Sequence, residues 1–430
     1  MAALDAPHPD GEPSDSSTPN HPAEPRDLRA NAHNPPSRAV LNDPIYRQRG
    51  GRPPVRPMRI DEAQPTPKLD GESAISSSAP TPAQLGFRMP AEFEPQDRVW
   101  VCTPTNPDTW PGCLDQAQDQ HAAWCGQMQK VVSVKAVQSV GISPEDAWIR
   151  DFGPIFVIDD EGNLAFNTFR FNAWGGKYPP WDKMDATPRF IGDFLNHERE
   201  DHVPFWEHQM VLEGGSFGVN GKGALLTTEA CLLHPNRNPS LSKQQIEANL
   251  AATLGVSHVI WMPAGIEGDD TDGHQDDIAQ WVSPDTIVCV HPSPDHHDFP
   301  ALDANWKALQ EATDQDGHKL NVAPLPVVDP PLYYPVDPDY KPQRILTDKP
   351  SGGGLVPASY ANFLISNGHL FLPVFGRPTD DAAIKAIEQA APHLTVVPIR
   401  AEWLVVGLGA MHCLSQQQPK AVDIYAPEGA

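Results

Sequence analysis

Short apolar runs that follow tight polar turns constrain the fold of this 430-residue chain more than any other feature. Such runs occupy residues 164–169, 224–228, 286–290 and 370–374. The turns before them are rich in Gly, Asn, Pro and Asp, the residues that most often reverse a chain. Each run therefore predicts a short strand that leaves a tight turn.

Helical patterns lie between some of these runs. Ser242 can cap a helix that carries apolar residues along one side and ends at Gly255. A second helix is predicted over residues 380–391, and strands are predicted at 259–262 and 395–399. The order strand, turn, strand, helix recurs at spacings of roughly 60 to 80 residues, which favours an α/β fold of repeated modules around a common centre.

The first 85 residues differ from the rest of the chain. They are crowded with Pro, Ser, Asp, Asn and Arg and contain few aromatic residues. Such a segment cannot bury enough apolar surface to offset the entropy lost on ordering, so we expect residues 1–85 to form a disordered tail. The composition becomes globular at Phe87, so residues 86–430 are expected to form the folded domain.

The formal net charge of −25 argues against unaided binding to nucleic acid or to an anionic membrane, and it is compatible with a cationic ligand. No stretch approaches the roughly 20 apolar residues that span a bilayer, and no secretory leader is evident. We therefore expect a soluble cytoplasmic protein. The six cysteines form no CxxC pair and no disulfide-scaffold pattern, so reduced thiols are the simpler interpretation.

Cys413 stands out among the cysteines because of the residues around it. A lone cysteine in a cytosolic protein is more often a small buried apolar residue than a nucleophile. Cys413, however, follows Gly407, Gly409 and Ala410, which let a backbone approach a ligand closely, and it precedes a polar Ser-Gln-Gln-Gln segment. A plain turn gives the same local pattern, so this loop alone leaves both interpretations open.

Acidic and histidine residues far upstream complete a chemical hypothesis. Asp151 precedes a Phe-Gly-Pro turn, and Glu213 precedes two glycines. His274 and Asp276 have the i, i+2 spacing that puts both side chains on one face of a strand. A thiol, a histidine and three carboxylates suit a planar cation, and a guanidinium offers five N–H donors that two carboxylates can clamp.

A metal site is the rival interpretation of the same region. His274 and Asp276 offer metal ligands, as do His291, His296 and His297. The chain has no HExxH or CxxC spacing, and the last three histidines lie in a loop rich in Pro and Asp. The guanidinium interpretation is therefore favoured, with the metal site kept as an alternative.

Eight sequence blocks resemble the agmatine deiminase and bacterial peptidylarginine deiminase family, in that family's order. They span residues 87–419 and read FRMPAEFEPQ, WIRDFGP, FRFNAWGGKYPPWD, VLEGGS, LLTTEACLLHPNRNPSLSK, GDDTDGHQDD, ASYANF and HCLSQQQP. The resemblance implies the pentein fold, a five-module pseudo-symmetric α/β propeller with its active site at the centre. It also makes a homodimer plausible, and it implies neither a metal nor an organic cofactor.

Carried over by motif, the resemblance makes Cys413 the nucleophile and His274 the general acid and base. Asp151 and Asp276 would be the carboxylates that grip the guanidinium nitrogens, and Glu213 would hold or orient the substrate. The three carboxylates should raise the pKa of the thiol in the empty enzyme, and a bound cation should lower it again.

The substrate end of the site carries both matches and departures. Asn172 and Trp174, in the NAWGG block, match the agmatine branch and are expected to contact the substrate. Arg170 stands where that branch usually has Asn. If it faces the pocket, its guanidinium would favour a substrate carboxylate, and the alternative is a strand residue that points elsewhere. Phe152 replaces a usual Thr, and Leu408 replaces a usual Gly in the loop before the nucleophile.

The function implied is that of a hydrolase acting on C–N bonds of linear amidines. Its expected substrate is a small cationic guanidino compound, agmatine, with N-carbamoylputrescine and ammonia as products that feed putrescine and polyamine synthesis. Arginine or peptidylarginine, giving citrulline, is the first alternative. A catalytically silent homologue that binds guanidines is the second.

Overall fold

The computed structural model describes residues 80–199, 202–335 and 353–421. Most of the predicted tail, residues 1–79, lies outside the described residues. The last residues assigned to the tail include the 3-10 helix η3 (Ala83–Leu85), and Leu85 packs against the buried cluster that contains Phe87. The described structure therefore begins slightly before the predicted domain boundary, and the disorder of the tail stays a prediction.

Most of the described strands belong to three-stranded sheets with one shared pattern. In each sheet, a central strand pairs antiparallel with one neighbour and parallel with the other. The described residues contain five such sheets and one two-stranded sheet of β12 (Tyr333–Pro335) and β13 (Gly353–Leu355). The five are β17-β1-β2 (Ser415–Pro419, Gln96–Val101, Ser133–Ala136), β3-β4-β5 (Ile155–Ile158, Leu164–Arg170, Phe205–Val211), β6-β7-β8 (Phe217–Val219, Ala224–Thr228, His258–Met262), β9-β10-β11 (Ala279–Ser283, Thr286–Val290, Asn321–Leu325) and β14-β15-β16 (Leu364–Ser366, His369–Val374, Thr395–Arg400).

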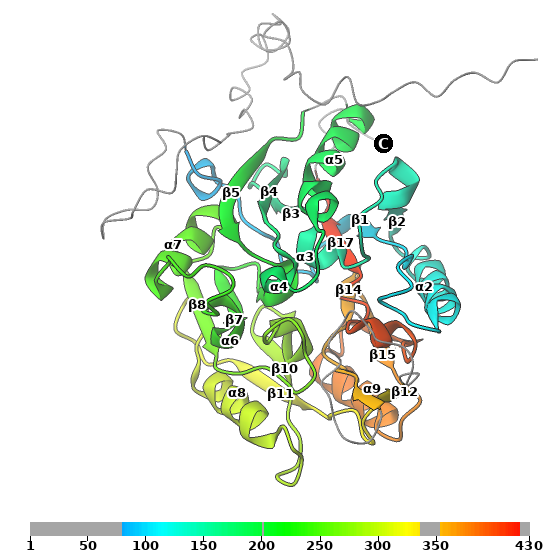
Figure 1. Cartoon of the computed structure of the whole chain (residues 1–430). Helices are drawn as coiled ribbons and strands as arrows, with labels where there is room; N and C mark the ends of the chain where they lie inside the picture. Colours follow the sequence, from blue (N-terminus) through cyan, green and yellow to red (C-terminus); the bar gives the residue numbers. More distant parts are fainter. Residues whose placement is uncertain (1–79, 200–201, 336–352, 422–430) are drawn as a thin grey trace, which may run out of the picture. The chain divides into compact units, whose positions relative to one another are not determined.

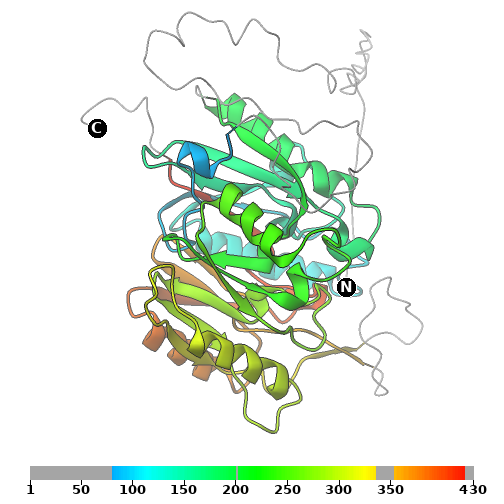
Figure 2. The same cartoon turned by 90° about the vertical axis from the view of Figure 1, so that its left-hand side faces the viewer.

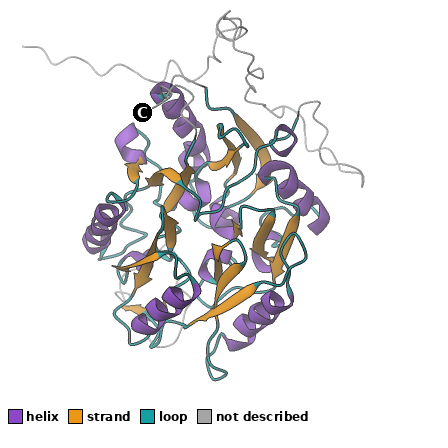
Figure 3. Cartoon of the chain, turned by 180° about the vertical axis from the view of Figure 1, so that it is seen from behind, coloured by secondary structure: helices purple, strands orange, loops and turns teal. Residues whose placement is uncertain are grey.

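A helix leads from the central strand of each sheet to its parallel neighbour, because two parallel strands need a crossover connection. These helices are α2 (Leu114–Met128), α5 (Asp182–Glu198), α7 (Lys243–Leu254), α8 (Phe299–Glu311) and α9 (Asp380–Ala390). Figures 1 and 3 show them on the outer side of the strands. Figure 2 shows α8, in yellow-green, in front of the strands that it connects.

Shorter helical turns connect one sheet to the next or precede a crossover helix. They are η4 (Val137–Val140), α3 (Ile149–Phe152), α4 (Ala173–Gly176), η5 (Gly214–Ser216), α6 (Glu229–Leu232), η6 (Gln275–Asp277) and η7 (Leu404–Gly407). No helix among the described residues is long and apolar enough to cross a bilayer. All six cysteines are free, in agreement with the prediction of reduced thiols.

The predicted helices and strands are confirmed. The Ser242 side chain accepts from the amide of Gln245, whose own side chain accepts from the Ser242 amide. Helix α7 then ends at Gly255, which has a left-handed φ of 70°. Helix α9 and strands β8 and β16 cover the ranges predicted for them to within one residue at each end. The α/β class inferred from these patterns is therefore correct.

The apolar faces of strands and helices meet in two buried clusters. The larger contains three indole side chains that are fully buried, Trp100, Trp110 and Trp124. The smaller contains residues of the β3-β4-β5 and β6-β7-β8 sheets, such as Ile155 and Phe217. Burial of large aromatic and aliphatic side chains is the main favourable term in folding, and it gives the connecting turns a close-packed support.

The first sheet joins the two ends of the described chain. Strand β17 pairs antiparallel with β1 and places Gln416 opposite Trp100. The indole of Trp100 donates to Gln418 Oε1 at 3.0 Å, which ties the same two strands by side chains. Cys413 lies just before β17, so the closing strand also fixes the position of this thiol.

Candidate active site

The residues singled out from the sequence occupy similar places in different sheets. Asp151 lies in α3 just before β3, Glu213 precedes η5 and β6, and Cys413 precedes β17. His274 and Asp276 lie at η6 just before β9, in a 3-10 turn and not in a strand as their spacing suggested. Each sits where the chain enters the antiparallel outer strand of a sheet, and contacts join all five into one buried cluster.

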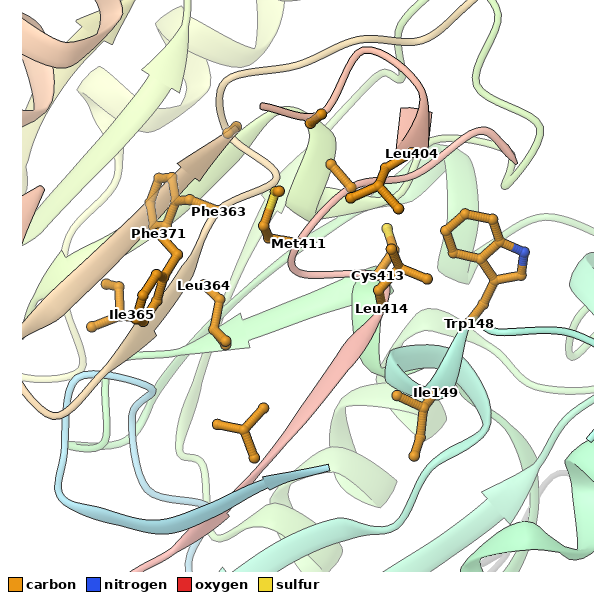
Figure 4. Close-up of a cluster of buried hydrophobic side chains, with 14 of the residues drawn as sticks. Trp148, Ile149, Phe363, Leu364, Ile365, Phe371, Leu404, Met411, Cys413 and Leu414 are labelled. Carbon is orange, nitrogen blue, oxygen red and sulfur yellow. The ribbon is translucent and has the colours of Figure 1, made fainter. Parts of the chain in front are cut away.

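The Cys413 thiol is only 5% exposed. Its Sγ lies 3.4 Å from Asp276 Oδ2 and 3.0 Å from the donating Nδ2 of Asn362. Figure 4 shows Cys413 beside the apolar side chains of Leu404 and Trp148. The thiol therefore meets a carboxylate and an amide donor within an otherwise apolar surround.

Burial and nearby negative charge favour the protonated thiol in the empty site. Burial is the largest cause, and the carboxylates of Asp276, Asp277 and Asp151 add to it, so that the pKa of Cys413 is well above its ordinary value. The direction is the one expected from the sequence, with Asp277 contributing where Glu213 was expected.

Asn362 organises the loop that carries the thiol. Its Oδ1 accepts from the backbone amides of Ala410, His412 and Cys413 at 3.1, 3.2 and 3.3 Å. Its Nδ2 donates to Cys413 Sγ and to Asp277 Oδ1, both at 3.0 Å. One buried side chain thus fixes the loop and supplies a donor that stabilises a thiolate.

His274 is fully buried between two carboxylates. Its Nδ1 lies 3.7 Å from Asp151 Oδ1 and 3.9 Å from Asp276 Oδ1. Burial opposes a charge on the ring, but Asp151, Cys231 and Asp276 outweigh it and raise the pKa of His274 well above its ordinary value. The ring is therefore suited to hold a proton at neutral pH and to deliver it to a leaving group.

Two neutral donors orient Asp151. Trp174 Nε1 donates to its Oδ2 at 2.9 Å, and the amide of Gly215 donates to its Oδ1 at 3.0 Å. Burial raises the pKa of Asp151 to about 6, although His274 acts in the opposite direction. Asp151 is thus ionised at neutral pH and takes up a proton in mildly acidic solution.

A chain of charged groups holds Asp276. His412 Nδ1 lies 2.8 Å from Asp276 Oδ2, and His412 Nε2 lies 2.9 Å from Glu92 Oε2. We assign a proton to both ring nitrogens because each faces a carboxylate. Burial and Arg150 disfavour the charged ring, but Glu92 and Asp276 favour it and raise the pKa of His412. Burial alone would raise the pKa of Asp276, but His412 outweighs it and lowers that pKa, so Asp276 stays ionised.

Glu213 is held on one side only. Its Oε1 accepts from Arg237 Nε at 2.6 Å, and both side chains are fully buried. Glu213 Oε2 and Asp276 Oδ1 have no hydrogen-bond partner among the described residues. Buried acceptors without a partner are costly. These two oxygens are therefore suited to a ligand rich in N–H donors.

Gly215 keeps the space between these groups open. A Cβ atom at this position would lie 2.7 Å from His274 Nδ1, 2.8 Å from Asp151 Oδ1 and 2.9 Å from Asp276 Oδ2. Any side chain here would displace the acid and base groups, so the second glycine after Glu213 has a steric role.

Trp174 forms one wall of the cluster and also lines a cleft of about 520 Å³. The cleft is further lined by three acidic residues, Asp108, Glu145 and Asp146, and by Lys177. The ammonium of Lys177 lies 2.9 Å from Asp272 Oδ1, which offsets its charge. A cleft of net negative charge therefore leads to the indole that holds Asp151.

Asn172 supports the turn that presents Trp174. Its side chain accepts from the amide of Gly175 at 2.8 Å and donates to the carbonyl of Asn236 at 2.9 Å. Ala173 and Trp174 have left-handed φ values of 52° and 54°, which non-glycine residues rarely adopt. Asn172 thus acts on the indole through the backbone, and a direct contact with substrate stays a prediction.

Arg170 is a strand residue at the surface, one of the two environments considered from the sequence. It ends β4 with its side chain 48% exposed, and its Nη2 lies 3.1 Å from Asp185 Oδ2 of α5. Arg170 thus forms an ion pair at the surface, and a contact with substrate stays a prediction.

Phe152 packs behind the Trp174 wall. It is buried and meets Phe171 edge to face at a centroid distance of 5.8 Å, and Phe171 meets Trp174 in the same way at 5.2 Å. Phe in place of the usual Thr at position 152 therefore affects the packing behind Trp174.

The metal site considered from the sequence is wrong in its ligands. Among the described residues, His296 and His297 group with Asp298, apart from the group that contains His274, and His291 belongs to neither. The five predicted ligands are therefore not brought together.

Sequence reasoning missed Asn362, His412 and Glu92. His412 directly precedes Cys413, and the other two lie within the recognised blocks ASYANF and FRMPAEFEPQ. Asn362 also lies just before β14, the place where the other sheets carry their site residues. The repeat pattern, applied to this sheet, is the signal that would have found it.

Comparison with known proteins places this chain in a family. A family profile described as Porphyromonas-type peptidyl-arginine deiminase matches residues 88–419. An agmatine deiminase of Pseudomonas aeruginosa is 35% identical over 369 residues, covering 80% of this chain and 99% of the relative. An agmatine deiminase of Stutzerimonas stutzeri is 36% identical over 365 residues, covering 79% and 97%. The solved agmatine deiminase of Enterococcus faecalis superposes with a TM-score of 0.72 at 32% identity, covering 80% of this chain and 99% of that one.

Proposed function

The chain belongs to the Porphyromonas-type peptidyl-arginine deiminase family, and we propose that it is a hydrolase that deiminates agmatine to N-carbamoylputrescine and ammonia. This activity would feed putrescine synthesis. Residues 86–430 would form the catalytic domain. The relatives that carry the name agmatine deiminase match nearly their whole length, which supports this substrate over the alternatives.

One observation carries the proposal above the others. A thiol, an imidazole and three carboxylates converge in a buried cluster, where Asp276 Oδ1 and Glu213 Oε2 lack donors. A guanidinium supplies planar N–H donors to such oxygens and stays protonated at neutral pH. The same contacts would hold its central carbon against Cys413, which is the positioning contribution to the rate.

The first half of the reaction forms a covalent intermediate. The bound cation lowers the pKa of the Cys413 thiol, which releases its proton to solvent. The thiolate, with Asn362 Nδ2 as donor, then attacks the guanidinium carbon. His274 donates a proton to one nitrogen of the tetrahedral adduct, and the C–N bond breaks to release ammonia. The product of this half is an S-alkylthiouronium on Cys413.

The second half restores the enzyme. His274, now neutral, takes a proton from water as the oxygen attacks the thiouronium carbon. The C–S bond then breaks, Cys413 leaves as thiolate, and the new oxygen becomes the urea carbonyl as its proton is released. The thiolate takes up a proton when the product leaves. One water and one guanidinium thus give one substituted urea and one ammonium ion, with no change of oxidation state.

The acidic cleft supports agmatine as the substrate. Agmatine ends in an amine, whereas arginine carries a carboxylate at the far end. Glu145, which lines the cleft, accepts from the backbone amides of Lys183 and Met184 at 3.3 and 3.1 Å, and these neutral donors leave its negative charge in place. Such a cleft attracts a cationic end and repels a carboxylate. Arg170, the residue whose guanidinium would favour arginine, is engaged by Asp185 in an ion pair, which also supports agmatine.

We also propose that the five sheets are the modules of a pseudo-symmetric propeller. Their shared strand order and crossover helices support it, as do the contacts of β17 with β3 and of β6 with β9. A homodimer and a cytoplasmic location stay predictions from the sequence.

The test is ammonia release by the purified full chain. Agmatine, free arginine and a blocked arginine peptide would be compared, with Cys413→Ser as the inactive control. We expect release from agmatine alone, lost in the variant. Ammonia release from an arginine substrate would show that arginine is the substrate in place of agmatine. No ammonia from any of the three would favour the homologue that only binds guanidines.

A further inference from the structure

A second thiol, Cys231, lies beside the catalytic histidine and takes no part in the mechanism above. Cys231 is fully buried in α6, and its Sγ, a carboxylate oxygen of Glu213 and a ring nitrogen of His274 all lie within 4.8 Å of one another. The three residues come from three different chain segments. From this juxtaposition we propose that Glu213, Cys231 and His274 form an inhibitory site for a zinc ion.

The three donors are the ones that zinc prefers. Thiolate, imidazole and carboxylate are its usual protein ligands, and three of them leave a fourth position for water. Donor atoms around a tetrahedral zinc lie roughly 3.3–3.8 Å apart. Small rotations of the three side chains would bring their atoms from within 4.8 Å to that spacing. The thiol proton would be released to solvent on coordination, with no redox change.

Independent evidence comes from the polar atoms left without partners. Glu213 Oε2 and both ring nitrogens of His274 are buried and have no hydrogen-bond partner in the described residues. Arg237 holds the other oxygen of Glu213 at 2.6 Å, which fixes the direction of the unpartnered oxygen. Buried polar atoms without a partner are costly, so these atoms favour a ligand.

Backbone contacts hold the ligands in place. The hydroxyl of Thr228 accepts from the amide of Cys231 at 3.2 Å and donates to the carbonyl of Gly273 at 2.5 Å. Gly273 directly precedes His274, so one side chain links the segments of two proposed ligands. A site whose ligands are supported in this way loses less entropy on binding a metal.

Zinc at this position would stop the reaction. A coordinated His274 nitrogen cannot exchange a proton, and a coordinated Glu213 oxygen cannot accept from a guanidinium. Zinc and substrate would therefore compete. This inhibitory consequence rests on the proposed function, whereas the metal site itself does not, and two separate measurements keep them distinguishable.

The first measurement is cobalt binding to the full-length, metal-free Cys413→Ser protein. Co²⁺ replaces zinc and gives a near-ultraviolet charge-transfer band when a thiolate binds it, and Cys413 cannot contribute in this background. We expect the band, its loss on adding Cys231→Ser, and its retention on adding Cys289→Ser. Cys289 is the matched control because it is equally buried, in β10 away from the cluster. A band that persists without Cys231, or no band at all, overturns the proposal.

A second variant keeps the test decisive if Cys231→Ser folds poorly. Glu213→Gln in the same background leaves the thiol in place and should weaken cobalt binding by more than about tenfold, since loss of an outer-shell partner alone costs about 10–100-fold. Unchanged affinity would contradict the ligand set.

The second measurement is zinc inhibition of ammonia release from agmatine, with each protein compared with its own zinc-free rate. We expect inhibition that EDTA reverses, that agmatine relieves competitively, and that is at least about tenfold weaker in Cys231→Ser. Equal sensitivity in both proteins would assign the inhibition to another site.

Discussion

At the scale of single residues, Asn362 is the link between the loop and the chemistry. Its oxygen binds three backbone amides of the loop that ends at Cys413, and its nitrogen is the donor nearest to the thiol. The loop also contains Leu408 with a left-handed φ of 80°, a conformation that costs a non-glycine residue roughly 1–2 kcal/mol. Asn362 therefore stabilises a loop that local preferences disfavour.

The isosteric change Asn362→Asp should separate the two roles. The aspartate keeps an acceptor for the loop amides but replaces the donor to Cys413 Sγ and to Asp277 Oδ1 by an acceptor. Loss of a hydrogen bond to a charged group costs about 1.5–3 kcal/mol, so kcat should fall about 10–100-fold while the fold persists. Steady-state kinetics and circular dichroism measure the two effects.

Asn305→Asp is the matched control. Asn305 is equally buried and bonds both the amide and the carbonyl of Ala264, away from the cluster. This variant should lose stability and keep its kcat. An Asn362→Asp enzyme with a normal kcat would show that the donor plays no part in attack.

A pH effect follows from Asp151. Its pKa is raised to about 6 by burial, so the carboxylate becomes neutral as the pH falls through that value. A neutral Asp151 no longer attracts a guanidinium, so kcat/KM for agmatine should decrease below about pH 6. The indole of Trp174 donates to Asp151 and lowers its pKa. Trp174→Phe should therefore move this acidic limb to higher pH.

Trp261→Phe is the control for that experiment, because the Trp261 indole also donates to a carboxylate, that of Glu247 at 2.8 Å. Its acidic limb should stay where it is in the unchanged enzyme. The assignment to Asp151 would be lost if Trp174→Phe left the limb in place, or if both variants moved it equally.

The sequence predicted those site residues whose side chains have an uncommon chemical role. Cys413, His274 and the three carboxylates were assigned from the sequence and lie together. Asn362, His412 and Glu92 were not, because buried amides and ion pairs of this kind are also common as structural groups. Only the three-dimensional contacts distinguish the two uses.

At the scale of elements, α4 is a strained turn that the sequence did not reveal. Its residues Ala173 to Gly176 all have left-handed φ values, between 52° and 92°. The Asn172 cap and the packing of the Trp174 ring against Phe171 maintain this conformation. Apolar periodicity predicts long helices and strands such as α7 and β8, but it says nothing about a four-residue turn whose conformation is set by tertiary contacts.

Alanine variants of the two glycines of α4 can separate the energetic cost of backbone strain from that of a steric clash. Both have left-handed φ values, but a Cβ on Gly175 would collide with Asn236, whereas a Cβ on Gly176 meets no atom within 4 Å. Gly176→Ala should cost roughly 1–2 kcal/mol of folding free energy. Gly175→Ala should cost clearly more and reduce kcat/KM, because the displaced turn moves Trp174. Denaturant unfolding gives both values, and equal losses would refute the collision argument.

At the scale of the whole molecule, the site forms because the same three-stranded arrangement recurs in five sheets of the described residues. Each of the five sheets receives the chain through a short segment, and these segments carry Asp151, Glu213, His274 with Asp276, Asn362 and Cys413. Site residues from five distant parts of the sequence thus come together, although no sequence pattern connects these parts directly. The recurrence of strands and helices predicted the class of fold and favoured modules around a common centre, whereas the five-module propeller came only from the family resemblance and stays a proposal.

The central claim is that Cys413 attacks the guanidinium carbon held by the surrounding carboxylates. The most direct measurement is mass spectrometry of enzyme quenched in acid during turnover of agmatine, followed by peptide mapping. The account predicts an adduct equal to agmatine minus ammonia on the peptide that contains Cys413, absent in Cys413→Ser. Turnover without such an adduct, or an adduct on Cys231, would contradict it.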